Sequence, residues 1–248
     1  MAVTDFLGGK IRLAQSDTGH RAGTDALLLA ALVEAADAGT VVDAGSASGA
    51  AGLCIARRFE TAQVRLIDID AHQVTLARQN IELNHFSDRV HALQGDLLAP
   101  FAQREGQGLT SEDADCVITN PPYLDETRDR VSNDPEKNRA HVMPPKGLAL
   151  WLKACNALLK SNGRLHLIHR ADRLPDILNA LPQNFGGLRI IPVYPRETDP
   201  AIRILVTAIK NSRAPMALAP GLILHSSDGR FTARAEALHK GESGLTAP

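Results

Sequence analysis

The sequence predicts an α/β fold whose sheet is mostly parallel and ends in an antiparallel pair of strands. Short apolar segments alternate along the chain with longer segments of helical periodicity, which is typical of a parallel sheet covered by helices. One early strand is followed by a Gly-rich turn and a helix, the arrangement of nucleotide-binding proteins. Two late apolar segments, 188–194 and 202–209, are separated by a short connection, which favours an antiparallel pair.

The expected elements of the amino-terminal half begin with a strand or hairpin at the domain edge. This element is indicated by the polar–apolar alternation of 10–13. A segment rich in helix-forming residues follows at 26–36, and we expect a helix there with Thr24 or Asp25 as its N-cap and Gly39 as its stop. Strands at 40–44, 64–67 and 90–94 then alternate with helices at 50–59 and 71–83, the second of which Asp70 is expected to cap.

The carboxyl-terminal half continues this alternation around two polar segments. Residues 100–113 and 124–146 are expected to be loops. The remaining expected elements are a strand at 115–119, a helix at 147–160 stopped at 162–163, a strand at 164–168, a helix at 174–181, the two late strands, and a possible strand at 222–224. We expect a hairpin extension at 1–22, a main domain at 23–210 and an appendage on the same domain at 211–248.

Composition narrows the class of protein. The 248 residues carry a formal net charge of −1, which argues against a generally basic surface that coats nucleic acid or membranes. The longest apolar stretch, 26–33, is too short to span a bilayer. Cys54, Cys116 and Cys155 lack the spacing of metal ligands and fit a reducing compartment. We therefore expect a cytoplasmic protein without a bound metal ion or a membrane partner.

The Gly-rich turn lies between the expected strand at 40–44 and the helix at 50–59. Its pattern is Asp-x-Gly-x-x-x-Gly from Asp43 to Gly49, which disfavours a dinucleotide site. Asp68 ends the next strand, where a carboxylate commonly accepts hydrogen bonds from a ribose diol. Asp96 follows the third strand and could accept a hydrogen bond from an adenine amine or serve only as a turn residue.

The segment Asn120-Pro121-Pro122-Tyr123 follows the strand at 115–119, at the end of the strand where α/β proteins bind ligands. Prolines have no N–H to donate, so this turn presents carbonyl oxygens, and the Asn side chain adds another acceptor. Paired acceptors suit a planar amine, and Tyr123 offers a ring on which a base can stack. The alternative is a Pro-rich turn that closes the strand, with Tyr123 as core filler.

Basic residues occur in two segments that could meet RNA phosphates. The first is the 124–146 loop, which could equally be a solvated loop, and the second is the carboxyl-terminal segment, which could equally be a frayed terminus. The basic residues are Arg128, Arg130, Lys137, Arg139, His141 and Lys146 in the loop, and Lys210, Arg213, Arg230, Arg234 and Lys240 in the tail.

Taken together, these motifs resemble the class I S-adenosylmethionine-dependent methyltransferases. The resemblance rests on 43–49, Asp68, Asp96 and the segment from Asn120 to Tyr123. It implies a Rossmann-like, seven-stranded, mostly parallel sheet with an antiparallel terminal hairpin. Three further segments resemble the bacterial tRNA1(Val) adenine(37)-N6-methyltransferase-like group, namely 6–10 (Phe-Leu-Gly-Gly-Lys), 20–29 (His-Arg-Ala-Gly-Thr-Asp-Ala-Leu-Leu-Leu) and 220–225 (Pro-Gly-Leu-Ile-Leu-His).

The resemblance also implies roles for individual residues. Asn120 and the Pro121 carbonyl would bind the target amine, and Tyr123 would stack on the target base beside Pro122. The implied cofactor-binding residues are Thr24, Asp25, Asp43, Gly45, Ala47, Gly49, Asp68, Ile69, Asp96, Leu97 and Asn120. The group usually has glycine where this chain has Ala47, and a methyl group there is unfavourable if the position needs a positive φ.

The expected activity is methyl transfer from S-adenosylmethionine to an adenine amine in RNA, with tRNA as the expected substrate, by a monomer or homodimer. One alternative is a protein glutamine amide as acceptor, although enzymes of that kind usually carry an amino-terminal substrate-binding domain. Another is a protein that keeps the fold as a binding module, as the alanine at position 47 would suggest.

Overall fold

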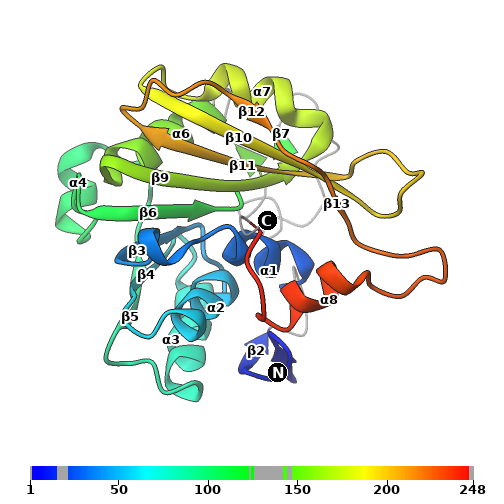
Figure 1. Ribbon diagram of the computed structural model, residues 1–248. Coiled ribbons are helices and arrows are strands. Elements are labelled where there is room, and N and C mark those ends of the chain that lie inside the picture. Colours follow the sequence, from blue (N-terminus) through cyan, green and yellow to red (C-terminus); the bar gives the residue numbers. More distant parts are fainter. Residues whose placement is uncertain (1, 16–21, 123, 126–141, 144–146, 246–248) are drawn as a thin grey trace.

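The computed structural model describes residues 2–15, 22–122, 124–125, 142–143 and 147–245. In this part of the chain the central sheet has nine strands, in the order β12-β10-β11-β9-β6-β3-β4-β5, with β13 also paired to β10 (Figure 1). Their bounds are β3 Thr40–Ala44, β4 Gln63–Asp68, β5 Val90–Gln94, β6 Ala114–Thr119, β9 Leu159–Arg170, β10 Phe185–Tyr194, β11 Arg203–Lys210, β12 Ala217–Leu218 and β13 Leu222–Ile223.

The seven long strands confirm the expected sheet. Strands β3, β4, β5, β6 and β9 run parallel, and β11 is antiparallel to both β9 and β10. The late pair is therefore the expected hairpin. The two-residue strands β12 and β13 extend the sheet by pairing parallel to β10.

Helices cover both faces of the sheet. Helices α1 (Thr24–Ala31), α2 (Ala50–Arg58) and α3 (Ala71–Leu83) pack on one face, and α6 (Gly147–Leu158) and α7 (Leu174–Ala180) pack on the other (Figure 1). Neighbouring strand residues alternate between the two apolar layers, because successive side chains of a strand point to opposite faces. Val41 belongs to the α1 layer and Val42 to the α6 layer.

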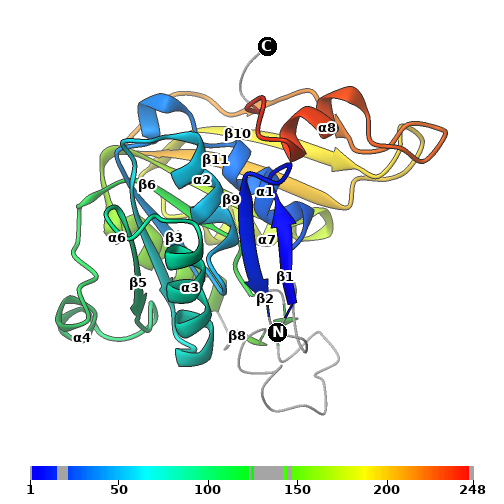
Figure 2. The same cartoon turned by 90° about the horizontal axis from the view of Figure 1, so that it is seen from below.

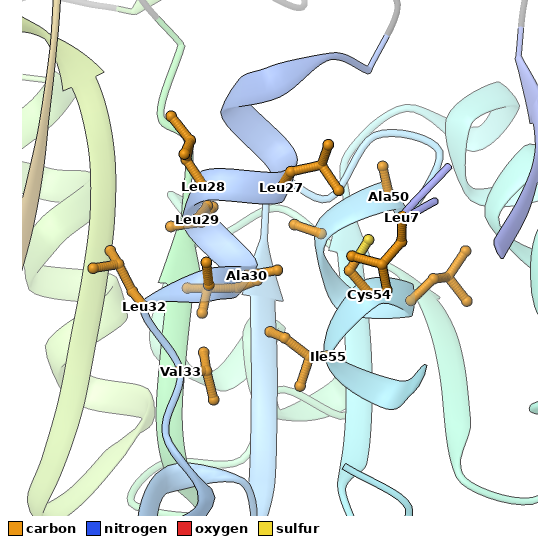
Figure 3. Packing of buried hydrophobic residues seen from close by; sticks show 14 of the residues in the cluster. Leu7, Leu27, Leu28, Leu29, Ala30, Leu32, Val33, Ala50, Cys54 and Ile55 are labelled. Carbon is orange, nitrogen blue, oxygen red and sulfur yellow. The ribbon is translucent and has the colours of Figure 1, made fainter. Parts of the chain in front are cut away.

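The α1 layer is built largely from leucine. Figure 3 shows where α1 and α2 meet, with Leu28, Leu29 and Ile55 all at most 1% exposed. Burying each such side chain contributes roughly 1.5–3 kcal/mol. This packing fixes α1 and α2 against the sheet and so sets the position of the loops that precede both helices.

The amino-terminal hairpin, β1 (Ala2–Phe6) with β2 (Ile11–Gln15), pairs with itself and lies beside α3 (Figure 2). Two asparagines of α3 hold it. Asn80 accepts from the Ala14 N–H at 2.7 Å and donates to the Ala14 carbonyl at 3.0 Å, while Asn84 bonds both backbone groups of Arg12. These side chains take the place of a neighbouring strand along β2.

Several predicted boundaries were wrong. The helix expected at 26–36 ends at Ala31, and Leu32 and Val33 turn inward before a 3₁₀ turn at Ala35–Asp37. Its N-cap is Gly23, not Thr24 or Asp25. The helix expected to reach 160 ends at Leu158, because β9 already begins at Leu159, which pairs with Ala114 beside a bulge.

Several short helices and strands were not predicted from the sequence. The 100–113 segment contains helix α4 (Phe101–Gly106), the polar 124–146 segment contributes the paired strands β7 (Leu124–Asp125) and β8 (Val142–Met143), and the tail contains α8 (Ala233–His239). Helix α8 packs against α1, and the Leu245 N–H donates to the Ala31 carbonyl. None of the helices in the described part of the chain combines the length and hydropathy needed to cross a bilayer.

Candidate active site

The carboxyl ends of four neighbouring parallel strands bring the predicted segments to one edge of the sheet. Ala44, the last residue of β3, pairs with Ile67 of β4 on one side and with Thr119 of β6 on the other. On the far side of β4, Asp68 pairs with Gln94 of β5. The residues that follow these pairs, which include Gly45 and Asn120, therefore leave the sheet next to one another.

The Gly-rich loop is held by its own backbone hydrogen bonds. The N–H groups of Gly45 and Ser46 both donate to the Ile67 carbonyl at 2.9 Å, and the Gly49 N–H donates to the Ser46 carbonyl at 2.8 Å. Gly45 and Gly49 have φ values of 75° and 87°, which glycine adopts without a steric penalty. The loop thus turns sharply from β3 into α2, with Ala47 exposed and Ser46, Ser48 and Gly49 buried.

Ala47 occupies the exposed tip of this loop with φ of 46°. The left-handed region costs an L-residue with a Cβ roughly 1–2 kcal/mol. The Ala47 N–H donates to Asp68 Oδ2 at 2.8 Å, and this charge-assisted hydrogen bond helps to hold the strained conformation. The sequence expectation that this position favours glycine therefore has a structural basis.

Asp68 lies half-buried at the end of β4. Its Oδ2 accepts from Ala47 and its Oδ1 accepts from the Asp70 N–H at 2.9 Å. Burial raises the pKa of Asp68 above its usual value, and the backbone N–H groups of Asp70 and Ala47 oppose that rise. A carboxylate has about four acceptor positions, so it can accept further hydrogen bonds from hydroxyl groups. The next residue, Ile69, is 58% exposed and offers an apolar surface beside the carboxylate.

Asp43 lies beneath the loop and only 3% of its surface is exposed. Its Oδ2 accepts from the Gly52 N–H of α2 at 2.9 Å. Burial raises the pKa of Asp43 to about 7, with the Gly52 hydrogen bond opposing the shift and the Asp68 charge adding to it. A Cβ at Gly52 would stand 2.3 Å from a Leu66 methyl, so α2 approaches β4 closely here. Asp43 therefore anchors α2 behind the loop.

Asp96 and Leu97 follow β5 at the same edge. The Asp96 Oδ1 accepts from the Leu98 N–H at 2.8 Å in a local side-chain turn, and the Asp96 N–H donates to Gln107 Oε1 at 3.2 Å. Asp96 is half-buried, whereas Leu97 is 4% exposed and belongs to the α6 layer of the core. The role of Asp96 as a turn residue, one of the two alternatives from the sequence, is therefore present. The turn leaves the Asp96 carboxylate at the edge of the sheet.

The segment after β6 is anchored by Thr119, the last residue of that strand. Thr119 is fully buried, and its Oγ1 donates to the Ala44 carbonyl at 2.9 Å. Asn120 and Pro122 are half-buried, and Pro121 is buried between them. Tyr123 and the basic residues of 126–141 and 144–146 lie outside the described residues, so their expected roles remain predictions.

Thr24 and Asp25 at the start of α1 have partners in the carboxyl-terminal half of the chain. The Thr24 hydroxyl lies 3.2 Å from His239 Nε2 of α8, and Asp25 Oδ2 accepts from Arg203 Nε of β11 at 3.0 Å. These contacts tie the start of α1 to the tail and to the strand hairpin. They give both residues a role in positioning α1 in addition to the cofactor contacts that the sequence suggested.

Two residues at this site were missed by sequence reasoning. Trp151 of α6 donates through Nε1 to the Thr119 hydroxyl at 2.9 Å. Asn80 is fully buried and donates to the carbonyl of Ser48 in the Gly-rich loop at 3.0 Å. The sequence carried a signal only for the second, because an asparagine occupies a core-facing position of the amphipathic helix at 71–83.

The residues at this edge fit the cofactor that the resemblance implied. Asp68 could accept the hydroxyl groups of a ribose, and the exposed Ile69 could pack on an adenine ring. Asp96 could accept from the adenine amine. The carboxylates and the exposed apolar side chain at this edge thus agree with S-adenosylmethionine, which joins an adenosine to a cationic sulfonium.

Comparison with known proteins places the chain in a family. A family model described as the methyltransferase small domain matches residues 16–192. The tRNA1(Val) (adenine(37)-N6)-methyltransferase of Porphyromonas gingivalis is 31% identical over 183 residues, which cover 71% of this chain and 69% of that protein. Matches to two further proteins of the same name cover 64% and 62% of their lengths, so the chain spans slightly less than two thirds of some relatives.

Two other similarities bear on the acceptor. The release factor glutamine methyltransferase of Chlorobaculum tepidum is 26% identical over 174 residues, which cover 67% of this chain and 58% of that protein. A solved structure from Agrobacterium tumefaciens, described as "a predicted O-methyltransferase, protein Atu636", is 33% identical with a TM-score of 0.76, covering 89% of this chain and 98% of that one. The chain belongs to the methyltransferase small domain family and is an S-adenosylmethionine-dependent methyltransferase.

Proposed function

We propose that this methyltransferase modifies the exocyclic amine of an adenine in RNA, and that the RNA is a tRNA. The observation that carries the proposal is the register of β3 and β6. Because Ala44 pairs with Thr119, the loop from Gly45 and the turn from Asn120 start side by side at the edge of the sheet. The bonded Thr119 hydroxyl holds the two strands together at this point.

The turn supplies acceptors to the target amine. The Asn120 side-chain oxygen and the Pro121 carbonyl accept the two N–H bonds of a flat NH2 group, which orients its nitrogen and raises its electron density. Neither proline has an N–H that competes for these acceptors. Burial of Pro121 and half-burial of Asn120 exclude part of the water from the turn and strengthen these hydrogen bonds.

The Gly-rich loop and the acidic strand ends hold the cofactor. Gly45, Ala47 and Gly49 line the methionine part, Asp68 accepts the ribose hydroxyls beside Ile69, and Asp96 accepts from the adenine next to Leu97. When bound, S-adenosylmethionine supplies a methyl group activated by its sulfonium sulfur. Asp43 supports the loop from below. We further propose that Thr24 and Asp25, at the start of α1, flank the carboxylate and amino ends of the methionine part.

An RNA acceptor is supported by the relatives named as tRNA1(Val) methyltransferases and by basic residues near the carboxyl terminus. Arg230 and Arg234 are exposed in the segment around α8, which packs against α1. The prediction that Lys210 also contacts RNA was wrong, because this residue is 6% exposed and its Nζ donates to the Leu159 carbonyl at 2.7 Å. A base in a tRNA loop is also easier to unstack and insert than a base in a duplex. We propose that Arg230, Arg234 and the 124–146 segment contact the RNA backbone.

A glutamine amide in a protein is the second candidate acceptor. The similarity to the release factor glutamine methyltransferase favours it, since an amide NH2 is also planar and the same turn would bind it. The two acceptors differ in what surrounds the amine. An adenine needs a ring to stack on, whereas a glutamine side chain needs room for an extended peptide.

The test is a transfer assay with labelled S-adenosylmethionine. The enzyme is incubated separately with bulk tRNA from a strain that lacks its gene and with purified release factor. We expect label in tRNA, and N6-methyladenosine among its nucleosides by mass spectrometry. Label confined to release factor, or a methylated tRNA nucleoside other than N6-methyladenosine, would contradict the proposed acceptor.

A further inference from the structure

A relay of two hydrogen bonds connects helix α6 to both halves of the active site. Trp151 Nε1 donates to Thr119 Oγ1 at 2.9 Å, and Thr119 Oγ1 donates to the Ala44 carbonyl at 2.9 Å. Thr119 immediately precedes Asn120, and Ala44 immediately precedes Gly45. The relay therefore acts at the last residues of β6 and β3. The turn that starts at Asn120 (the amine-binding turn) and the Gly-rich loop from Gly45 to Gly49 (the cofactor loop) begin directly after them.

The Trp151 ring also contacts the cofactor loop directly. A Cβ added to Gly45 would stand 3.1 Å from Trp151 Cζ2 and 3.2 Å from Cη2, so the ring packs closely against the Gly45 backbone. Gly45 has a positive φ of 75°, and its N–H is bonded to Ile67 on the opposite side. The loop is thus held between β4 and the indole ring at the point where it leaves β3.

Thr119 suits this relay because a hydroxyl group can donate one hydrogen bond while it accepts another. Its side chain is fully buried, so water has no access to replace either partner. An isosteric valine at this position would fill the same space and break both links. A phenylalanine at position 151 would retain an aromatic ring beside Gly45 and break only the first link.

The neighbours of Trp151 on α6 have a different role. Leu152, Cys155 and Leu158 are at most 3% exposed and fill the core between α6 and the sheet. Trp151 is half-buried and packs at the margin of this layer, with its N–H directed to the site. Core packing alone therefore does not account for the position of the Trp151 ring or for its hydrogen bond.

We propose that Trp151 is a positioning residue, which acts through Thr119 to hold the amine-binding turn at a fixed distance from the cofactor loop. Methyl transfer needs the reacting atoms in line and within about 3–3.5 Å, so a small displacement of one segment relative to the other lowers turnover more than it lowers binding. The proposal rests on the proposed function only for the identity of the acceptor.

The test compares Trp151→Phe, Thr119→Val and the double variant. Each single variant is expected to lower kcat about tenfold or more, with the cofactor Kd from calorimetry changed less than about threefold. Because both substitutions break the same relay, the double variant is expected to be no slower than Thr119→Val alone. Independent losses that multiply in the double variant would overturn the proposal, as would a Kd that rises in step with the fall in kcat.

The matched control is Thr207→Val on β11. Thr207 Oγ1 lies 2.9 Å from His166 Nδ1 in the same sheet, so this variant loses a comparable hydrogen bond away from the site. It is expected to retain wild-type kcat. An equal loss of kcat in Thr207→Val would reveal a general effect of weakened sheet packing and would overturn the positioning role.

A measurement on the wild-type protein keeps the proposal testable if the variants do not fold. Trp151 is the single tryptophan of the chain, so tryptophan emission reports on the surroundings of this one ring. Titration with S-adenosylhomocysteine is expected to change its emission, and an unchanged emission at saturation would contradict the contact between the ring and the loop. The kinetic tests use whichever of tRNA or release factor the wild type methylates, so failure of the RNA assignment and failure of the relay are distinguishable.

Discussion

Ala47 donates its backbone N–H to the Asp68 carboxylate at 2.8 Å while its own φ is 46°. The tip of the Gly-rich loop is thus held in a strained conformation by an acidic residue at the end of the neighbouring strand. Ala47 stands where the family usually has glycine, and Asp68 is the residue that we assign to the ribose hydroxyls. This hydrogen bond therefore connects the unusual residue of the loop to the proposed ribose site.

We expect Ala47→Gly to stabilise the protein. Removal of the Cβ relieves roughly 1–2 kcal/mol of left-handed strain, and the greater freedom of glycine in the unfolded chain offsets about half of that. The net gain of up to about 1 kcal/mol should raise Tm by roughly 2–4 °C in thermal unfolding. Ala201→Gly is the control, since that residue has no positive φ and should lose stability. A lower Tm for Ala47→Gly would contradict the strain argument.

Asp43 makes the stability of the protein depend on pH. Its folded pKa is raised from the usual value of 3.8 to about 7 by burial. Between these values the unfolded chain releases a proton that the folded chain retains, so stability falls as pH rises from about 4 to about 7. Above pH 7 the carboxyl is ionised in both states and the loss is complete.

Asp43→Asn should remove this dependence and keep an acceptor for the Gly52 N–H. The free energy of unfolding of the variant relative to wild type should increase by up to about 1.4 kcal/mol per pH unit across that window. Urea unfolding at several pH values between 4 and 7.5 measures it. A difference that stays constant over the range would show that Asp43 does not titrate there.

Asn80→Ala should destabilise the protein strongly, by roughly 2–4 kcal/mol. The substitution leaves the Ala14 backbone and the Ser48 carbonyl without their buried partner. Asn84→Ala, which affects more exposed bonds to Arg12, is the matched control and should cost roughly 0.5–1.5 kcal/mol. Denaturant unfolding gives both values, and equal costs would argue against a special role for the buried asparagine.

Asp68→Asn should weaken cofactor binding, because a neutral amide accepts hydroxyl hydrogen bonds less strongly than a carboxylate. We expect the Kd for S-adenosylhomocysteine to rise about tenfold in calorimetry, which corresponds to about 1.4 kcal/mol. Asp88→Asn, an exposed acid before β5, serves as the control and should bind as wild type does. Unaltered affinity in the Asp68 variant would remove this residue from the cofactor site.

Local patterns predicted the parts of the fold that depend on local sequence. The strands at Thr40–Ala44 and Val90–Gln94 and the helix at Ala71–Leu83 have the expected bounds, because periodicity and caps define them. The end of α1 and the start of β9 depend on tertiary packing, which periodicity does not reveal. Helix α8 did carry a signal, since Thr232 caps it through the Ala235 N–H.

The candidate site likewise combines features that local sequence predicts with contacts that only tertiary packing creates. The segments that form it were recognisable because each follows an apolar strand with unusual residues. The contacts that join them were not, because Trp151 and Thr119 are far apart in the sequence and meet only through the placement of α6 over β6. The pairing of Asp25 with Arg203 likewise depends on the antiparallel hairpin closing next to α1.

The central claim is that Asn120 binds the target amine and not the cofactor alone. The most direct measurement is turnover of Asn120→Ala with the preferred acceptor, together with its Kd for S-adenosylmethionine. Asn179→Ala, an exposed asparagine of α7, is the control for the substitution itself. We predict that Asn120→Ala loses at least about 99% of kcat, or roughly 2.7 kcal/mol, and keeps a Kd within a few-fold of wild type. Methylation by that variant at the wild-type rate would contradict the account.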